Sequence, residues 1–385
     1  MRDVMPALKR WWDASTPVGM ATVVATWRSA PRQAGASMLV GQDGEAVGSV
    51  SGGCVEGAVY ELATTVVADG VPVLQRFGVS DEDAFAVGLT CGGIVDVFVE
   101  RVDRTTFAEL GDVIADVEAG RPVAVCTMIE HPDPARVGAR LVVRAPAGQA
   151  VTAEASETPE TLGTLGSARF DHAVTDDALG LLESGRTETL AYGPDGERRG
   201  EGARVFVSSF APRPRMLVFG AIDFASALAR MGAFLGYRVT VCDARPVFAT
   251  RSRFPDADEV VVSWPHEYLA AQAGAGLIDS RTVIAVLTHD PKFDVPLLEV
   301  ALRLPNVAYI GAMGSRRTSD DRMARLREAG LTEAELSRLS APIGLDLGAR
   351  TPEETAVSIA AEMISLRWGG AGERLSETVG AIHHH

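Results

Sequence analysis

The chain has 385 residues, of which 46% are hydrophobic and 23% charged, with 36 Lys and Arg against 51 Asp and Glu. This length predicts two or three domains, and the composition excludes a disordered chain. The formal net charge of −15 disfavours nucleic acid or an anionic membrane surface as the principal partner.

The N-terminal residues do not resemble a targeting segment. The first twenty include the basic and aromatic run from Lys9 to Trp12 but not the apolar core of a signal peptide. Nowhere does an uncharged apolar stretch reach the roughly 18 residues that a membrane span needs. We therefore expect a cytoplasmic protein with no membrane span. The last three residues are histidines typical of a purification tag, and we expect residues 371–385 to form a tail.

The four cysteines indicate neither a zinc ribbon nor a disulfide framework. They are widely spaced, and no two of them form a C-x-x-C pair. Reduced thiols of this kind are typical of cytoplasmic proteins. Cys126 and Cys242 lie in apolar runs that predict buried strands, whereas Cys54 and Cys91 are flanked by glycines.

Residues 1–211 are predicted to form one domain with an internal duplication, whose halves span about 18–100 and 121–208. At an offset of 103 residues, Ala21, Pro31, Gly35, Ala36 and Val40 fall on Ala124, Pro134, Gly138, Ala139 and Val143. At an offset of 115, residues 48–59 fall on residues 163–174, and each half ends near a Phe-Val dipeptide. We expect two copies of a unit of strands, loop and helix, each opening with a pair of strands. Chance similarity in a Gly- and Ala-rich sequence is the alternative.

The duplication serves as an internal control, because the fold explains the residues that both copies share. Gly48 and Gly163 are then turn residues, and the aligned acids Glu56 and Asp171 suit the dipole of a helix N-terminus. Cys54 is different, because the second copy has an arginine at the aligned position. Its thiol is therefore not needed to build the fold, which makes it a candidate for function.

Cys54 follows Gly52 and Gly53 at the expected start of a helix. Unpaired backbone N–H groups and the helix dipole lower a thiol pKa at such a position, so we expect a nucleophile or a soft metal ligand. Cys91 has a similar setting in Gly88-Leu-Thr-Cys-Gly-Gly93. The alternative for both is a buried cysteine that packs as a small hydrophobic residue.

A proline-rich basic connector, Ala211 to Arg215, leads into a second predicted domain at residues 212–370. Apolar runs alternate there with helical patterns. Continuous runs of Val, Ile and Leu are typical of a parallel sheet covered by helices on both faces. The five predicted strands are residues 216–221, 238–242, 259–263, 282–287 and 307–310. We therefore predict an α/β fold with a doubly wound parallel sheet in this half.

An incomplete dinucleotide-binding motif follows the first of these strands. The G-x-G-x-x-G positions are occupied by Gly220, Ile222 and Ala225, so the glycine that lets a pyrophosphate approach the backbone is missing. Asp223 adds negative charge where a phosphate would bind. Asp243 matches the position that binds a ribose, but it would equally serve as a helix cap. NAD(P) binding is therefore disfavoured.

Three later loops lie where open α/β sheets bind their ligands. They are Thr288-His289-Asp290, Gly311-Ala-Met-Gly-Ser-Arg-Arg317 and Gly344-Leu-Asp-Leu-Gly-Ala-Arg350. Free N–H groups, a hydroxyl and guanidinium groups suit a phosphate, so we predict an anion site at Gly314, Ser315, Arg316 and Arg317. Thr351-Pro-Glu-Glu354 is a capping box that explains the last loop without a ligand. His289 is a candidate ligand or a turn residue.

Taken together, these segments resemble the XdhC/CoxI-type accessory proteins, which mature molybdenum hydroxylases such as xanthine dehydrogenase and carbon monoxide dehydrogenase. The resemblance spans nearly the whole chain and rests on Ser29-Ala-Pro-Arg-Gln-Ala-Gly35, Gly48-Ser-Val-Ser-Gly-Gly-Cys-Val-Glu56, Gly88-Leu-Thr-Cys-Gly-Gly93, Gly311-Ala-Met-Gly-Ser-Arg-Arg317 and Gly344-Leu-Asp-Leu-Gly348. It implies an N-terminal XdhC/CoxI domain and a C-terminal Rossmann domain. The incomplete glycine motif departs from family members that look dinucleotide-competent, and it favours the carbon monoxide dehydrogenase branch.

The resemblance also implies a function. It is that of a maturation factor, a cofactor-binding chaperone more than a catalyst, which binds molybdenum cofactor between its two domains, supports its sulfuration and delivers it to a molybdenum hydroxylase apoenzyme. A sulfur donor such as a cysteine desulfurase would be a further partner.

The residues matching the family motifs would then have defined roles. Cys54 would ligate molybdenum or relay sulfur, with Cys91 nearby and Gly52, Gly53 and Glu56 around it. The pterin phosphate would bind at residues 314–317, and the remaining cofactor-binding candidates are Gly220, Asp243 and His289.

Two other functions stay open on the sequence alone. One is an NAD(P)-dependent oxidoreductase that uses the second domain with His289 as acid or base, although the missing glycines argue against it. The other is a scaffold that joins a dehydrogenase to a sulfur donor and needs neither cysteine. A homodimer is expected for a chain of this size.

Overall fold

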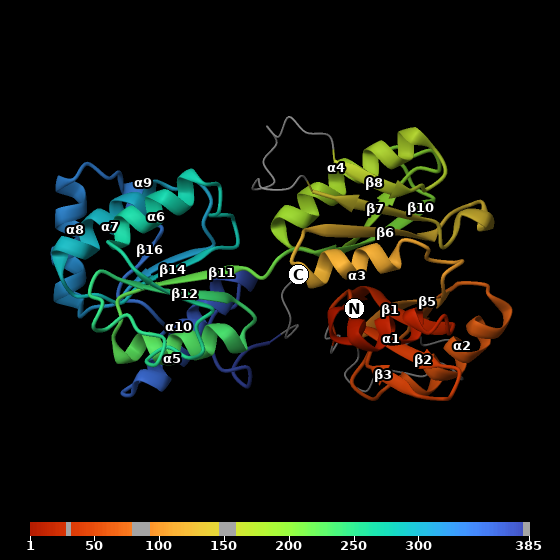
Figure 1. The fold of residues 1–385 in the computed structure, drawn as a ribbon, viewed down its shortest axis with the longest axis horizontal. Helices are drawn as coiled ribbons and strands as arrows, with labels where there is room; N and C mark the ends of the chain where they lie inside the picture. The colour runs from red at the N-terminus through yellow and green to blue at the C-terminus, as the bar shows by residue number, and fades with distance from the viewer. Residues whose placement is uncertain (28–31, 79–92, 146–158, 380–385) are drawn as a thin grey trace. The chain divides into compact units, whose positions relative to one another are not determined.

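The computed structural model describes residues 1–27, 32–78, 93–145 and 159–379. The chain divides into two compact units, Met1–Pro212 and Arg213–Val379 (Figure 1). Among the described residues, none of the helices is both long and apolar enough to cross a membrane.

The first unit contains two five-stranded sheets of identical topology. One is formed by β1 (Val18–Trp27), β2 (Ser37–Gly41), β3 (Ala46–Gly48), β4 (Val73–Phe77) and β5 (Ile94–Val102), in the order β3-β2-β1-β5-β4. The other is formed by β6 (Val123–Glu130), β7 (Arg140–Arg144), β8 (Glu160–Gly163), β9 (Glu188–Tyr192) and β10 (Ala203–Phe210), in the order β8-β7-β6-β10-β9. All neighbouring strands are antiparallel. The predicted internal duplication is confirmed.

Each sheet of the first unit carries a helix on its outer face. Alternate residues of a strand point to opposite faces, so Ala21 and Val23 of β1 pack against α2 (Glu56–Asp69), whereas Met20 packs on the other side. In the second copy, α4 (Ala168–Ser184) covers the matching face. Between the two sheets lie Val24, Phe98, Ile129 and Phe206. The unit is therefore layered as helix, sheet, sheet and helix.

Two further helices complete the core of the first unit. They are α1 (Met5–Asp13) and α3 (Leu110–Glu118), both labelled in Figure 1. They contribute Leu8 and Val113 to a cluster that includes residues of both sheets. Short 3₁₀ turns lie at Arg2–Val4 and Pro134–Arg136. Cys126 lies buried in β6, as predicted.

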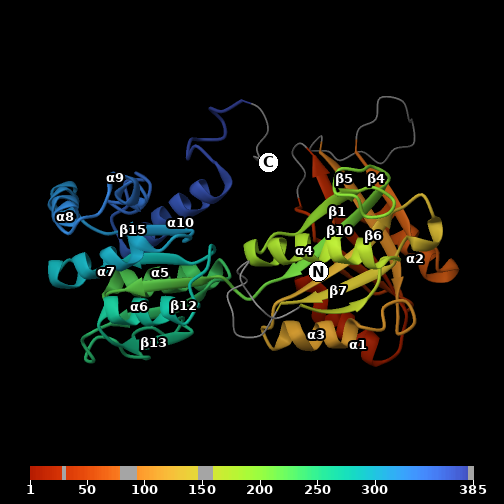
Figure 2. The same ribbon diagram turned by 90° about the horizontal axis from the view of Figure 1, so that it is seen from above.

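The second unit is a parallel sheet with the strand order of a Rossmann fold. Its strands are β11 (Arg215–Phe219), β12 (Arg238–Asp243), β13 (Glu259–Val262), β14 (Val283–Val286), β15 (Tyr309–Ala312) and β16 (Leu339–Ser340), in the order β13-β12-β11-β14-β15-β16. Figure 2 labels β12, β13 and β15 of this sheet, and Figure 1 labels the other three strands. All neighbouring strands are parallel. The predicted doubly wound α/β fold is confirmed, and β16 adds a short sixth strand.

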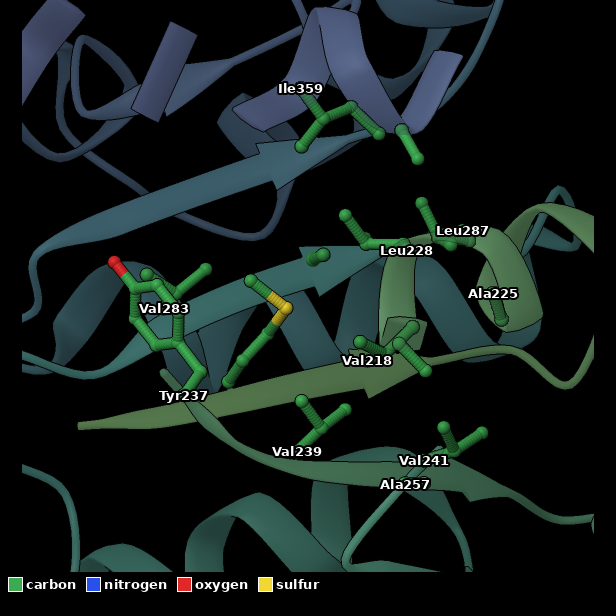
Figure 3. Packing of buried hydrophobic residues seen from close by; sticks show 14 of the residues in the cluster. Val218, Ala225, Leu228, Tyr237, Val239, Val241, Ala257, Val283, Leu287 and Ile359 are labelled. Atoms are coloured by element: carbon green, nitrogen blue, oxygen red, sulfur yellow. The ribbon is translucent and has the colours of Figure 1, made fainter. Parts of the chain in front are cut away.

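Helices cover both faces of this sheet, which explains its continuous apolar runs. Val218 of β11 packs with Leu228 of α5 (Asp223–Phe234) and Ile359 of α10 (Pro352–Trp368) (Figure 3). Leu217 of the same strand belongs to the cluster on the opposite face, where the helices are α6 (Pro265–Gly274), α7 (Pro291–Arg303), α8 (Arg316–Glu328) and α9 (Glu333–Leu336). Both side-chain directions of a strand are therefore buried.

Candidate functional site

The loop that carries Cys54 exists because α2 begins later than its counterpart in the second copy. Ala168, which opens α4, aligns with Gly53, whereas α2 opens at Glu56. Gly52 and Gly53 have φ angles of +79° and +120°, in a left-handed region that residues with a side chain rarely adopt. The glycine pair therefore replaces the first turn of the helix by a loop.

This loop is wrapped around the carboxylate of Glu56. The carboxylate accepts six hydrogen bonds, from the hydroxyls of Ser49 and Ser51 and from the backbone N–H groups of Ser51, Gly52, Gly53 and Val55. Burial alone would raise the pKa of Glu56, but the hydrogen bonds from Ser49 and Ser51 outweigh burial and lower the pKa to about 2. Glu56 is thus an ionised group that shapes the loop around itself.

The expectation of unpaired N–H groups beside Cys54 is wrong. The backbone N–H of Cys54 donates to the Ser51 hydroxyl at 3.0 Å, and the preceding N–H groups donate to Glu56. These groups are paired because an acid at the first position of a helix folds back onto the N–H groups that the helix leaves open. The N–H groups at the start of α2 are therefore paired within the chain itself.

The environment of Cys54 differs from that of its counterpart in the second copy. Cys54 is half-buried and packs against the core between α2 and the first sheet. Gly52 and Gly53 are exposed, and a Cβ atom added to either would meet no atom of the described residues within 4 Å. Arg169, at the aligned position, is an exposed residue inside α4. A thiol beside an open glycine loop is therefore specific to the first copy.

The second glycine-flanked cysteine, Cys91, lies outside the described residues, together with residues 88–92 of its motif and residues 29–31 of the first motif. Within the described ranges, no group of three or more His, Cys, Asp or Glu side chains is placed to hold a metal ion.

The first unit also contains an open pocket of about 510 Å³. Residues 32–36, between β1 and β2, form one wall, and Ser208 and Ser209 of β10 contribute to another. The backbone N–H of Ser49 donates to the Ser37 carbonyl at 3.1 Å, so the Cys54 loop is joined to the strand that follows residues 32–36. The volume suits a small organic ligand. The sequence alone does not reveal this pocket, because its walls come from distant parts of the chain.

In the second unit, Gly220 is required by packing within the chain. It has a φ angle of +109°. A Cβ atom there would lie 2.8 Å from Thr288 Cγ2 and 3.0 Å from the Thr288 backbone nitrogen. Gly220 therefore allows the loop after β14 to approach the loop after β11, and this explains the residue without a bound nucleotide.

Asp243 lies buried at the end of β12, and its carboxylate is already bonded. It accepts from the Ala221 N–H at 2.7 Å and from two guanidinium nitrogens of Arg245 at 2.9 and 2.8 Å. Burial alone would raise the pKa of Asp243, but the hydrogen bonds from Arg245 and Ala221 lower it. A ribose would have to displace these partners. Neither Asp243 nor Asp223 caps α5, because its N-cap residue is Ile222.

A buried ion pair that sequence analysis missed joins the loops after β14 and β15. Arg322 of α8 donates to Asp294 of α7 at 2.9 Å and to the Met313 carbonyl at 2.9 Å. The Thr288 hydroxyl donates to the same carboxylate. Burial raises the pKa of Asp294, and the hydrogen bonds from Thr288 and Arg322 oppose this rise. In the sequence, only the spacing indicates that Arg322 is on the buried face of α8, because it lies one helical turn before the buried Leu326.

The predicted anion site lies at the start of α8. Ser315 is the N-cap residue, and its hydroxyl accepts the Thr318 N–H at 3.1 Å. Gly314 is half-buried, and Arg316 and Arg317 are exposed in the first turn. The structure thus brings these residues together on one helix start. His289 is exposed in the loop after β14, and Cys54 belongs to the other unit.

The third loop, residues 344–350, is explained by local structure. The Thr351 hydroxyl accepts the Glu354 N–H at 3.1 Å, and the Glu354 carboxylate accepts the Thr351 N–H at 3.1 Å. The predicted capping box is confirmed. The Gly344 N–H donates to Glu362 of α10 at 2.7 Å, which ties the loop to that helix.

Comparison with known families matches both units. A model described as the XdhC and CoxI family matches residues 11–78 and 116–193, which is one segment in each copy of the duplication. A model described as the XdhC Rossmann domain matches residues 216–363. The chain belongs to the XdhC and CoxI family. The resemblance of the sequence motifs to this family is confirmed.

Several named proteins resemble the chain over most of its length. A Bacillus subtilis protein, named as a probable subunit of xanthine dehydrogenase, is 28% identical over 350 residues, covering 90% of this chain and 92% of that protein. The Escherichia coli molybdenum cofactor insertion chaperone PaoD is 25% identical over 349 residues, covering 90% and 83%. The crystal structure of a xanthine dehydrogenase from Bacillus halodurans matches with a TM-score of 0.64 and 25% identity over 97% of both chains.

Proposed function

We propose that this protein binds molybdenum cofactor as cargo and supports its insertion into a molybdenum hydroxylase. Membership of the XdhC and CoxI family supports this function, as do the names of two relatives, a molybdenum cofactor insertion chaperone and a probable subunit of xanthine dehydrogenase. The client enzyme would be of the xanthine dehydrogenase or carbon monoxide dehydrogenase type.

One observation supports assigning cargo binding to particular residues. The first copy of the duplication presents a thiol, Cys54, beside an exposed glycine loop, whereas the second copy continues its helix through the same position. A thiolate is a soft ligand that suits molybdenum, and a loop without side chains admits a bulky ligand. Cys54 is therefore proposed to contact the metal of the cargo.

The other candidate residues would position the loop or bind other groups of the cargo. Glu56 holds the glycine loop through its six hydrogen bonds. The start of α8, at residues 314–317, would bind the pterin phosphate. Cys91, His289 and the homodimer stay predictions. The sulfur needed for maturation would come from a donor such as a cysteine desulfurase.

A nucleotide-dependent oxidoreductase is the weaker alternative. Gly220 is explained by the approach of Thr288, and Asp243 is already bonded to Arg245. In a dinucleotide-binding enzyme, Gly220 would instead lie beside the pyrophosphate and Asp243 would bind the ribose.

The proposal is tested by measuring cargo retention. The full chain would be purified from a host that makes molybdenum cofactor, and molybdenum and oxidised pterin would be quantified for the native chain and for Cys54→Ser. We expect the variant to retain less than about a tenth of both, because loss of a metal–thiolate bond outweighs roughly 1.4 kcal/mol.

The matched control is Arg169→Ser, which makes the same kind of change at the aligned position of the second copy. It should retain the cargo at the native level. Equal molybdenum and pterin in native protein and Cys54→Ser would reject the role of the thiol. Absence of both from every preparation would reject cargo binding itself.

A further inference from the structure

Two buried polar groups on α8 have no hydrogen-bond partner among the described residues. They are Ser319 Oγ and Arg322 Nη1, and each residue is only 4% exposed. Folded proteins rarely leave a buried donor unpaired, and an unpaired charged donor is the costliest kind. The other terminal nitrogen of Arg322 is already used, by Asp294 and by the Met313 carbonyl. Nη1 therefore needs an acceptor.

The unpaired nitrogen is directed toward Gly314, just before the start of α8. A Cβ atom built on Gly314 would lie 3.5 Å from Arg322 Nη1 and 3.2 Å from Thr318 Cβ. Gly314 is half-buried and Ser315 is exposed, so Nη1 lies beneath a part of the chain close to the surface. A methyl group on Gly314 would be tight against Thr318, so glycine keeps a side chain away from Nη1.

The surrounding charges favour an anion as the acceptor. The N-terminus of α8, a helix of 13 residues, carries the positive end of the helix dipole. Arg316 and Arg317 stand in its first turn, with no acidic residue there, although basic residues are unfavourable at that end of a helix. Water would satisfy Nη1 alone, whereas an oxyanion would also compensate both exposed arginines and the dipole.

We propose that Arg322 lies at the base of an oxyanion site at the start of α8, and that the site binds a phosphate monoester. Gly314 gives access, and Arg322 Nη1 donates from below. Arg316 and Arg317 close over the ligand from the solvent side. The carrier of the phosphate, the pterin cargo, rests on the proposed function, but the site itself does not.

The site is separate from the usual dinucleotide phosphate position. That position is the loop between β11 and α5, whereas α8 follows β15, two strands away in the sheet order. In the β11–α5 loop, Gly220 is closely approached by Thr288, and Asp223 at the start of α5 is paired with Arg253. The start of α8 is therefore a different helix N-terminus from the one that binds the phosphates of a dinucleotide.

Binding of inorganic phosphate to the full chain tests the site. Titration calorimetry at low ionic strength would compare the native chain with Gly314→Ala, which places a methyl group beside Nη1, and Arg322→Lys, which keeps a cation for Asp294 but loses the second nitrogen. We expect both variants to bind at least about tenfold more weakly, because each loses a charge-assisted hydrogen bond.

Two variants serve as matched controls. Gly274→Ala adds a methyl group in α6 where a Cβ atom meets no atom of the described residues, and Arg325→Gln removes a charge from the last turn of α8. Both should bind phosphate within about twofold of the native chain, since neither touches the site. Unfolding midpoints would check that each variant is folded, and Gly314→Ala decides the result if Arg322→Lys does not fold.

The outcomes separate this inference from the proposed function. Phosphate affinity that is absent, or unchanged in both site variants, overturns the oxyanion site, even if the chain retains molybdenum through Cys54. Affinity that depends on Gly314 and Arg322 supports the site, even if no molybdenum is retained. NAD competing with phosphate at similar concentrations would overturn the assignment to a phosphate monoester.

Discussion

Glu56 is the residue whose protonation state most directly affects the candidate site. Its pKa in the folded protein is about 2, below the ordinary value of 4.5, so the unfolded chain binds a proton more readily. The stabilisation from Glu56 is therefore complete above pH 4.5 and is lost as the pH falls from 4.5 to about 2. In the folded protein the Glu56 carboxylate stays ionised at pH values that already protonate carboxyls of ordinary pKa, so the glycine loop should loosen only as the pH approaches 2.

Glu56→Gln tests this role. We expect it to lower the free energy of unfolding at pH 7 by about 1–2 kcal/mol, because the charged acceptor is lost from a partly screened site. Urea denaturation from pH 3 to pH 7 should show a flatter pH dependence for the variant. The control is Asp171→Asn, because Asp171 accepts two hydrogen bonds, from the Thr164 hydroxyl and the Leu165 N–H. An unchanged pH profile in Glu56→Gln would contradict this account.

At the scale of elements, the two copies differ most at the start of the helix that follows the third strand. Ser167 caps α4 through a hydrogen bond to the Phe170 N–H, and the helix begins at once. Gly52 takes the aligned position in the first copy and has a left-handed backbone, so α2 begins later. The glycine pair therefore shortens α2 at its N-terminus and places Cys54 in a loop.

Exchange of these residues should restore the helix. The double change Gly52→Ser and Gly53→Ala gives the first copy the cap and first helical residue of the second. We expect α2 to begin at residue 53 and the loop around Cys54 to be lost, with slower amide exchange at residues 54–56. Molybdenum retention should fall. We expect the stability to change little, because the preference of about 1 kcal/mol for alanine over glycine in a helix is offset by loss of the hydrogen bonds that Gly52 and Gly53 donate to Glu56.

The reverse exchange is the matched control. Ser167→Gly with Ala168→Gly should destabilise the protein by about 1–2 kcal/mol through the lost cap and helix propensity, without an effect on molybdenum content. If the forward exchange kept full molybdenum retention with a lengthened helix, the glycine loop would have no part in cargo binding.

At the scale of the whole molecule, each unit has its own core. The hydrophobic clusters formed by the described residues lie either within Met1–Pro212 or within Arg213–Val379. Units with separate cores are expected to fold alone. Fragments 1–212 and 213–379 should therefore each show a cooperative urea transition by circular dichroism and fluorescence.

A shorter fragment provides the control for this prediction. Residues 1–186 lack β9 and β10, and β10 is the neighbour of β6 in the second sheet. The unpaired edge of β6 and the incomplete core of the second sheet should abolish the cooperative transition. Failure of the fragment 1–212 to fold would show that the first unit depends on the second.

Local patterns in the sequence were enough to predict most of the fold. The apolar runs that become β11, β12 and β14 are buried on both faces, so their composition alone indicates a covered parallel sheet. The duplication was detectable because both copies keep the same turn glycines, Gly48 and Gly163, where a Cβ atom would meet a backbone carbonyl of the neighbouring strand. Cys54 stood out because that comparison removed the residues that the fold itself requires.

The sequence did not predict which groups the charged and small residues contact in the folded protein. The sequence determined by itself the two fold classes, the duplicated topology and the family, because these depend on hydrophobic periodicity and on motifs of neighbouring residues. Only the tertiary structure decided that Glu56 takes up the N–H groups beside Cys54, that Gly220 faces Thr288, and that Arg322 lies beneath Gly314. These contacts join segments brought together by loops and sheet order, and a side chain's partner depends on that three-dimensional packing.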